Sequence, residues 1–248
     1  MENIALQLYS IKELTNEDFL GTLKRVAEIG YDGVEFAGYF GTSAGQLKKA
    51  LDEYGLKAAG SHIGMPDLTE RLEEMIEYSL AIDSPYIICP GIPEDLRDHA
   101  DGYKRAAEMF DRIGERCKEQ GLRFGYHNHG IEFQRYDGLT GMELLASHTR
   151  PEHMFFELDT YWAEYAGFRA VEWMESFQDR CRILHIKDMK SKQDQRNTEI
   201  GSGILDFRAI TATGKRLGVE WYTVEQEEYE IPQLESIQKS LSYLRQIL

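Results

Sequence analysis

The sequence contains few cysteines and no long apolar run. Its three cysteines, Cys89, Cys117 and Cys181, lie far apart and lack CxxC spacing, which argues against a disulfide framework and a zinc knuckle. We interpret all three as small buried apolar residues. No apolar stretch approaches the roughly 18 residues of a membrane span, and the first residues lack the basic start and apolar core of a signal peptide. The sequence therefore predicts a cytoplasmic protein without a membrane anchor.

Positive charge is also scarce. Lys and Arg together number 28 against 43 acidic residues, which gives a net charge of −15. Proteins that bind nucleic acid usually present a basic face, and none is visible here, so we expect no nucleic-acid partner. This excess of acidic residues does not exclude a local basic pocket. With 248 residues, 42% of them hydrophobic, the chain is expected to form one domain over residues 1–248.

Apolar, strand-like segments recur at steady intervals, with no linker or low-complexity tract between them. The eight expected strands cover residues 4–10, 33–38, 56–62, 86–90, 123–129, 154–159, 182–187 and 221–226. Segments with apolar residues at helical spacing separate them. We expect Thr15 or Asn16 to cap the first helix, Gly30 and Gly55 to end two helices, and the last helix to start near Pro232.

Regular alternation of strands and helices predicts the fold class. Parallel strands joined by helical crossovers form α/β folds, and eight such units fit a closed barrel better than an open sheet. No GxGxxG follows the first strand, which argues against a dinucleotide-binding fold. The expected fold is a single (β/α)₈ TIM barrel, whose active site lies at the carboxyl ends of the strands.

Five of the expected strands end in polar residues that an apolar barrel does not need for stability. These segments are Gly60-Ser-His62, Tyr126-His-Asn-His129, Phe156-Glu-Leu-Asp159, His185-Ile-Lys-Asp188 and Val224-Glu-Gln-Glu227. Residues two apart in a strand share a face, so His127 is expected to point the same way as His129, and His185 as Lys187. Carboxylates and imidazoles gathered at one rim would repel or lack partners without a cation among them. A carboxylate-rich set with one imidazole favours Mn²⁺, with Mg²⁺, Co²⁺ and Zn²⁺ as alternatives.

Four motifs in a fixed order carry a family resemblance. They are Tyr126-His-Asn-His-Gly-Ile-Glu-Phe133, Glu157-Leu-Asp-Thr-Tyr-Trp162, Leu184-His-Ile-Lys-Asp188 and Val224-Glu-Gln226. Over essentially the whole chain the sequence resembles the xylose-isomerase-like TIM barrels of the sugar phosphate isomerase/epimerase family, which include ketose 3-epimerases and inosose dehydratases. The resemblance implies one divalent metal ion on Glu132, Asp159, His185 and Glu225.

The remaining polar residues of the mouth are candidates for substrate binding: His62, His127, His129, Lys187 and Trp162. The alternative for the histidines is a packed, hydrogen-bonded supporting role. Lys187 is expected either to polarise a substrate oxygen or to pair with Glu157 or Asp188. Glu157 is expected to support Asp159 or fill an interior layer of the barrel.

The expected activity is that of a metal-dependent sugar isomerase or epimerase. Proton transfer through a metal-stabilised enediolate of a ketose or keto sugar would use Glu132 and Glu225 as base and acid. The main alternative is a dehydratase or lyase acting on a keto-inositol or a 3-keto-glycoside. A non-catalytic sugar-binding subunit and an endonuclease IV-like DNA repair enzyme are further alternatives. The expected partner is a small sugar substrate, and related barrels often form homo-oligomers.

Overall fold

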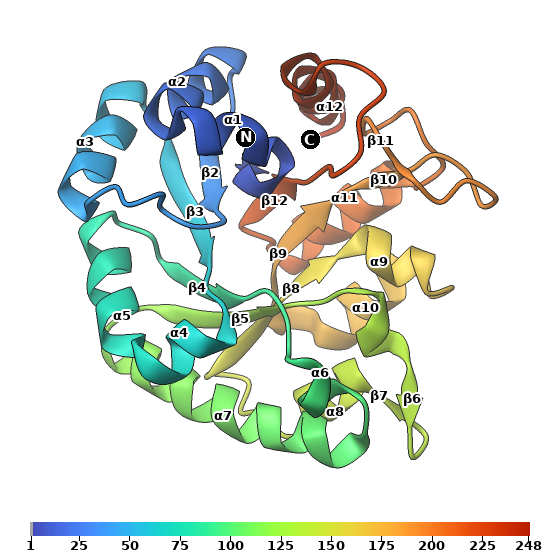
Figure 1. The fold of residues 1–248 in the computed structure, drawn as a ribbon. Coiled ribbons are helices and arrows are strands. Elements are labelled where there is room, and N and C mark those ends of the chain that lie inside the picture. Colours follow the sequence, from blue (N-terminus) through green and yellow to red (C-terminus); the bar gives the residue numbers. More distant parts are fainter. Residues whose placement is uncertain (1) are drawn as a thin grey trace.

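Eight parallel strands form a closed barrel in the computed structural model, which describes residues 2–248. Figure 1 shows the helices as a ring around these strands. The strands are Asn3–Gln7 (β1), Gly33–Phe36 (β2), Lys57–His62 (β3), Tyr86–Cys89 (β4), Arg123–His127 (β5), Met154–Asp159 (β8), Cys181–Ile186 (β9) and Trp221–Val224 (β12). Each pairs in parallel with its neighbours, and β1 closes the barrel against β12 with Asn3 opposite Trp221. The predicted (β/α)₈ fold is confirmed.

Helices cover the outside of the barrel and pack on a continuous apolar core. They are Lys12–Glu17 (α1), Phe19–Ile29 (α2), Ala44–Tyr54 (α3), Met65–Glu70 (α4), Leu72–Ala81 (α5), Glu94–Arg97 (α6), Ala100–Glu119 (α7), Gly141–Ser147 (α8), Thr160–Tyr165 (α9), Ala170–Phe177 (α10), Phe207–Leu217 (α11) and Gln233–Ile247 (α12). No helix among residues 2–248 is long and apolar enough to cross a membrane.

Most of the expected helix boundaries are confirmed, and one is wrong. Gly30 and Gly55 end α2 and α3 in the left-handed conformation that glycine adopts at little cost, and Pro232 directly precedes α12. The first crossover differs because it contains two helices. Asp18 separates them and caps α2 by accepting a hydrogen bond from the Gly21 N–H, so neither Thr15 nor Asn16 is the cap.

Several strands are shorter at their carboxyl ends than the sequence predicts. The first ends at Gln7 and continues as the 3₁₀ helix Leu8–Ile11 (η1), because the Gln7 side chain accepts a hydrogen bond from the Tyr9 N–H. The fifth ends at His127, and the 3₁₀ helix Gly130–Phe133 (η2) follows. His129 and Lys187 therefore lie beyond the paired strands, where the alternation rule does not fix the direction of their side chains.

The barrel interior is layered. One buried cluster contains only strand residues, among them Ala5, Phe155 and Ile183, and it is separate from the core under the helices. Two residues further along the same strands lie Gln7, Glu157 and His185, which are also fully buried. Because residues two apart share a face, these polar side chains form the next layer toward the carboxyl ends of the strands.

Short two-stranded hairpins extend the loops on this side of the molecule. Arg135–Tyr136 (β6) pairs with Leu139–Thr140 (β7), and Asp188–Met189 (β10) pairs with Asn197–Thr198 (β11). The 3₁₀ helix Gln178–Arg180 (η3) joins α10 to β9.

Candidate active site

Four side chains from neighbouring strands converge at the carboxyl end of the barrel. His127 ends β5, Asp159 ends β8, His185 lies in β9 and Glu225 directly follows β12. One ligand atom from each lies within 4.8 Å of the others, and all four residues are buried. This group (the upper group) contains three of the four predicted metal ligands, together with His127.

His185 connects the upper group to the polar layer below it. Its Nε2 lies 2.7 Å from Oε2 of Glu35, and its Nδ1 lies 3.2 Å from Oε2 of Glu225. A hydrogen on Nε2 satisfies the buried Glu35 carboxylate and leaves the Nδ1 lone pair facing Glu225. Two lone-pair-bearing atoms at that distance require a proton or a cation between them.

The polar layer around His185 also contains Glu35, Glu157, His62 and Gln7, and we name these four residues the lower layer. Gln7 Nε2 donates to Glu35 Oε2 over 2.8 Å, and His62 Nε2 lies 2.7 Å from Glu157 Oε2. His127 Nδ1 is 3.3 Å from the same Glu157 oxygen. The contact of His185 Nε2 with Glu35 leaves its Nδ1 for a ligand. His127 Nδ1 lies near Glu157 but has no hydrogen-bond partner.

The pKa values of the two lower-layer carboxyls shift in opposite directions. Burial, and then the charge of Glu35, raises the pKa of Glu157 above its usual range. Burial acts in the same direction on Glu35, but His62 and His185 outweigh it and lower the pKa of that carboxyl. The two carboxyls and the neighbouring imidazoles therefore gain and lose protons together, not as independent residues.

Lys187 places a positively charged side chain beside the upper group. Its Nζ lies 2.9 Å from Glu225 Oε2, 2.6 Å from Glu227 Oε1 and 3.6 Å from Asp159 Oδ2. Burial lowers the pKa of this ammonium, but the three carboxylates outweigh it and raise the pKa above the usual value. The predicted pairing of Lys187 with Glu157 or Asp188 is wrong, because its ammonium is surrounded by the carboxylates of Glu225, Glu227 and Asp159.

The buried carboxylates and imidazoles at this site fit a divalent cation. Glu35, Glu157, Asp159 and Glu225 are all at most 7% exposed, and Lys187 is the one buried lysine or arginine among residues 2–248. Asp159 Oδ1 caps α9 at the Trp162 N–H, whereas its Oδ2 is buried without a hydrogen-bond partner. Burial raises the pKa of Asp159 to about 6. Carboxylate oxygens and imidazole nitrogens with unused lone pairs are the ligands of Mn²⁺, Zn²⁺ and similar ions.

Glu132 is not part of the upper group. It belongs to η2, and its two oxygens accept hydrogen bonds from the Tyr126 hydroxyl (2.8 Å) and the His129 N–H (2.7 Å). Burial raises the pKa of this carboxyl. In this position Glu132 holds the backbone at His129, and the ligand and acid-base roles expected for it stay predictions.

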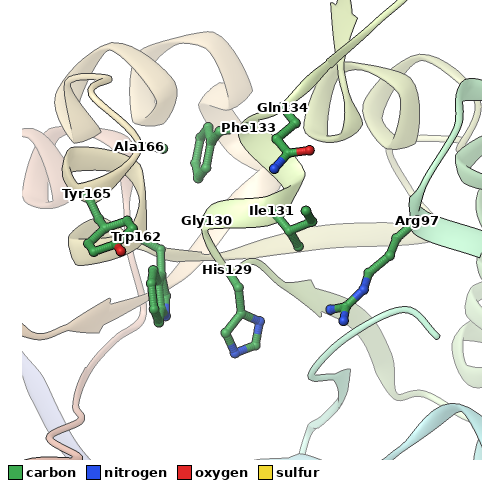
Figure 2. Close-up of a pocket in the computed structure, with 9 residues that line it drawn as sticks. All are labelled: Arg97, His129, Gly130, Ile131, Phe133, Gln134, Trp162, Tyr165 and Ala166. Carbon is green, nitrogen blue, oxygen red and sulfur yellow. The ribbon is translucent and has the colours of Figure 1, made fainter. Parts of the chain in front are cut away.

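Two of the five predicted substrate-binding residues, His129 and Trp162, line a cavity beside the upper group. The cavity has a volume of about 530 Å³, and the His129 ring lies 4.9 Å from that of His127, centroid to centroid. Figure 2 shows His129 between Trp162 and Arg97, with the guanidinium extending toward the imidazole. Burial lowers the pKa of His129 to about 4. The Lys187 ammonium lies 5.5 Å from the Trp162 ring, which joins the cavity to the upper group.

The lower layer contains two residues that the sequence reasoning missed, Gln7 and Glu35. Glu35 left a readable signal, since a carboxylate in the middle of a short apolar strand is rarely buried without a partner. Its partner His185 is 150 residues away in the chain, so no local pattern connects the two.

Comparison with known families gives one match over most of the chain. The model of the xylose isomerase-like TIM barrel family matches residues 23–247. A relative named inosose dehydratase, from Geobacillus kaustophilus, is 26% identical over 253 residues, which cover 83% of this chain and 79% of the relative. Another inosose dehydratase, from Lacticaseibacillus casei, is 25% identical, with 86% and 87% covered.

Solved structures show the same architecture. A sugar phosphate isomerase/epimerase from Parabacteroides distasonis superposes with a TM-score of 0.87 at 29% identity, covering 98% of this chain and 93% of the other. An L-ribulose 3-epimerase superposes with a TM-score of 0.77 at 14% identity, with 99% and 94% covered, which shows the fold alone. The expected membership of the xylose-isomerase-like TIM barrels is confirmed. Since the named relatives are enzymes, the prediction of an enzyme is confirmed as well.

Proposed function

Because the chain belongs to the xylose isomerase-like TIM barrel family, we propose that it is a divalent-metal-dependent enzyme that removes the proton next to the carbonyl of a keto sugar. The observation that carries this proposal is the upper group. Its four buried ligand atoms lie within 4.8 Å of one another at the mouth of the barrel. We assign the cation to His127, Asp159, His185 and Glu225, with Mn²⁺ as the expected ion.

The cation and the protein groups have separate tasks in this proposal. A divalent cation held there would polarise the substrate carbonyl and the hydroxyl on the adjacent carbon, which would make the C–H proton of that hydroxyl-bearing carbon more acidic. Glu225 contacts both His185 and Lys187 through Oε2, so Oε1 remains to accept that proton. Lys187 remains an ammonium among its carboxylates and donates a hydrogen bond to a substrate oxygen.

Two fates of the deprotonated substrate fit the site. If a proton returns to the opposite face of the carbon, or to the neighbouring carbon, the product is an epimer or an isomer. If the hydroxyl on the next carbon leaves with a proton, the product is an unsaturated ketone plus water. The inosose dehydratase relatives favour this second fate, and both fates share the first proton transfer.

Proton NMR in D₂O tests the proposal directly. The protein would be stripped of metal, reconstituted with Mn²⁺ or Mg²⁺, and incubated with a ketohexose, a 3-keto-glucoside and a keto-inositol. We expect deuterium to replace the proton next to the carbonyl of at least one substrate, and chelator to abolish the exchange. A new sugar isomer would identify an isomerase or epimerase, and an alkene signal would identify a dehydratase.

The Asp159→Asn variant is the matched control for that experiment. It keeps the volume of the side chain and its oxygen for capping α9, but it removes the charge from the orphan Oδ2. We expect the variant to fold and to lose metal-dependent exchange. Absence of exchange in the metal-loaded wild type across the three substrates would contradict the proposed function and favour a non-catalytic sugar-binding protein.

A further inference from the structure

The cavity beside the upper group is lined by hydrogen-bond donors and by no carboxylate. Its side chains are Arg97, His129, Ile131, Phe133, Gln134, Trp162, Tyr165 and Ala166. This composition is unusual in a chain with 43 acidic residues and a net charge of −15. We propose that this cavity binds a carboxylate or phosphate group on the substrate, so that the enzyme prefers anionic keto sugars over neutral ones. The proposal deepens the proposed function and rests on it.

Arg97 provides the positive charge. It ends α6, in the crossover after β4, and it is half-buried at the wall of the cavity. Among residues 2–248 its guanidinium has no carboxylate within 4 Å and donates no hydrogen bond to another residue, so its five N–H groups are available. A planar guanidinium binds carboxylate and phosphate oxygens through paired, charge-assisted hydrogen bonds.

Trp162 provides a second unused donor. Its indole Nε1 is buried without a hydrogen-bond partner, and its N–H can only donate. A buried donor without a partner is costly, and a ligand oxygen would remove that cost. Figure 2 shows Trp162 and Arg97 on opposite sides of His129 in the same cavity.

The cavity is close enough to the upper group to be part of one substrate site. The rings of Trp162 and His129 lie 5.7 Å apart, and the His129 ring is 4.9 Å from that of the candidate ligand His127. A sugar whose carbonyl lies at the upper group would therefore extend its far end along His129 into the cavity. An anionic group several bonds from the carbonyl would reach the donors there.

Glu132 offers a competing explanation of Arg97. Burial raises the pKa of this carboxyl, and the positive charge of Arg97 acts in the opposite direction without reversing it, although the two side chains form no ion pair. If Arg97 served only to balance Glu132, its loss would affect neutral and anionic substrates alike. A substrate-binding role would affect the anionic substrates selectively.

Calorimetric titration of the metal-loaded protein distinguishes these roles. The ligands are D-fructose, D-fructuronate and D-fructose 6-phosphate, which share a carbonyl but differ at the far end. We expect at least one of the two anions to bind about 10- to 100-fold more tightly than D-fructose, the range of charge-assisted hydrogen bonds to one guanidinium. Which anion gains more identifies the group as carboxylate or phosphate.

Variants at Arg97 give the decisive comparison. Arg97→Gln should abolish the preference for anions, with a much larger loss of affinity for the anions than for D-fructose, and Arg97→Lys should restore part of the preference. Trp162→Phe, which keeps an aromatic ring but lacks the N–H, should weaken anion binding by a smaller factor. Arg112→Gln is the control, because Arg112 is exposed on α7 and removing it changes the net charge by the same amount.

Equal affinity for neutral and anionic sugars in the wild type would overturn the inference, as would an anion preference that survives in Arg97→Gln. These failures are distinguishable from failure of the proposed function. Deuterium exchange without an anion preference would support the proposed enzymatic activity and contradict the anion site. An anion preference without any exchange would support the anion site and contradict the proposed activity.

Discussion

At the scale of single residues, the roles of His185 and Glu225 depend on carboxylates that hold the imidazoles in place. Glu35 accepts from Nε2 of His185, which directs the Nδ1 lone pair toward Glu225. Glu157 lies 3.3 Å from Nδ1 of His127, although the two atoms form no hydrogen bond. A histidine that binds metal commonly donates its other N–H to a carboxylate, which fixes its tautomer and orientation. The lower layer is therefore positioned to prepare the upper group for a cation.

We predict that Glu35→Gln weakens Mn²⁺ binding by about 10- to 100-fold. Gln7 and His185 both donate to Oε2, so the amide oxygen can replace it, but the variant loses the negative charge that makes the His185 ring a stronger ligand. Calorimetric titration with Mn²⁺ and the visible absorption of bound Co²⁺ would measure the effect. Glu53→Gln, an exposed change on α3, is the control. Wild-type affinity and an unaltered Co²⁺ spectrum in Glu35→Gln would show that the charge of this carboxylate does not make His185 a stronger ligand.

Glu132 and Glu225 are predicted to behave differently toward metal. Glu225→Gln should weaken Mn²⁺ binding by at least about 10-fold, because it removes a charged ligand from the upper group. Glu132→Gln should leave the affinity for Mn²⁺ unchanged and cost about 1–3 kcal/mol of folding free energy, because its amide would leave the Tyr126 hydroxyl or the His129 N–H without an acceptor. Metal titration and urea unfolding of both variants would measure this.

Loss of metal binding in Glu132→Gln would support the ligand set that the family motifs imply. It would also place His127 outside that set. The two variants thus decide between His127 and Glu132 as the fourth ligand, and turnover measured on the same preparations tests the acid-base role expected for Glu132.

At the scale of elements, Asp188 organises the segment after β9. Its carboxylate accepts hydrogen bonds from the backbone N–H groups of Met189, Gly201, Gly203 and Leu205. One buried side chain thereby fixes both ends of the loop that contains the β10–β11 hairpin. The adjacent Lys187 forms its ion pairs with Glu225 and Glu227 and not with Asp188.

We predict that Asp188→Asn destabilises the protein by about 2–4 kcal/mol, since an amide cannot accept from all four N–H groups and presents donors to some of them. Urea unfolding measures the loss, and limited proteolysis should show faster cleavage between residues 189 and 205. Asp206→Asn is the matched control in the same loop, because asparagine caps a helix about as well as aspartate and α11 should be unaffected. Equal stability of the two variants would contradict this account of Asp188.

At the scale of the whole molecule, the candidate metal ties together four strands of the barrel. β5, β8, β9 and β12 each contribute one residue to the upper group, and these strands are consecutive neighbours around the barrel. A cation that binds the folded state but not the unfolded chain stabilises folding by mass action. Here it would also relieve the repulsion among buried carboxylates.

We predict that Mn²⁺ at about 100 times its dissociation constant stabilises the protein by about 2.7 kcal/mol, which corresponds to roughly 5–10 °C in melting temperature for a chain of this size. Differential scanning calorimetry with increasing Mn²⁺ would measure the shift. The Asp159→Asn variant should show little of it. An equal shift in the wild type and in Asp159→Asn would indicate that Mn²⁺ stabilises the protein at another location.

The sequence by itself determined the barrel and the end of it where the polar residues gather. Apolar strand-like runs, helical spacing of apolar residues and glycine at helix ends are local features, and local features fix elements and their order. The same reasoning placed Asp159, His185 and Glu225 at one mouth, because parallel strands point their carboxyl ends in one direction.

Only the tertiary structure decided which of these side chains meet. Barrel closure brings Glu35 of β2 across the interior to His185 of β9, and it surrounds Lys187 with carboxylates from β8 and from the segment after β12. It also placed His127 in the upper group and turned Glu132 toward its own backbone at His129. Such pairings depend on strand register and on the exact ends of the strands, which the chain acquires only when the sheet closes on itself.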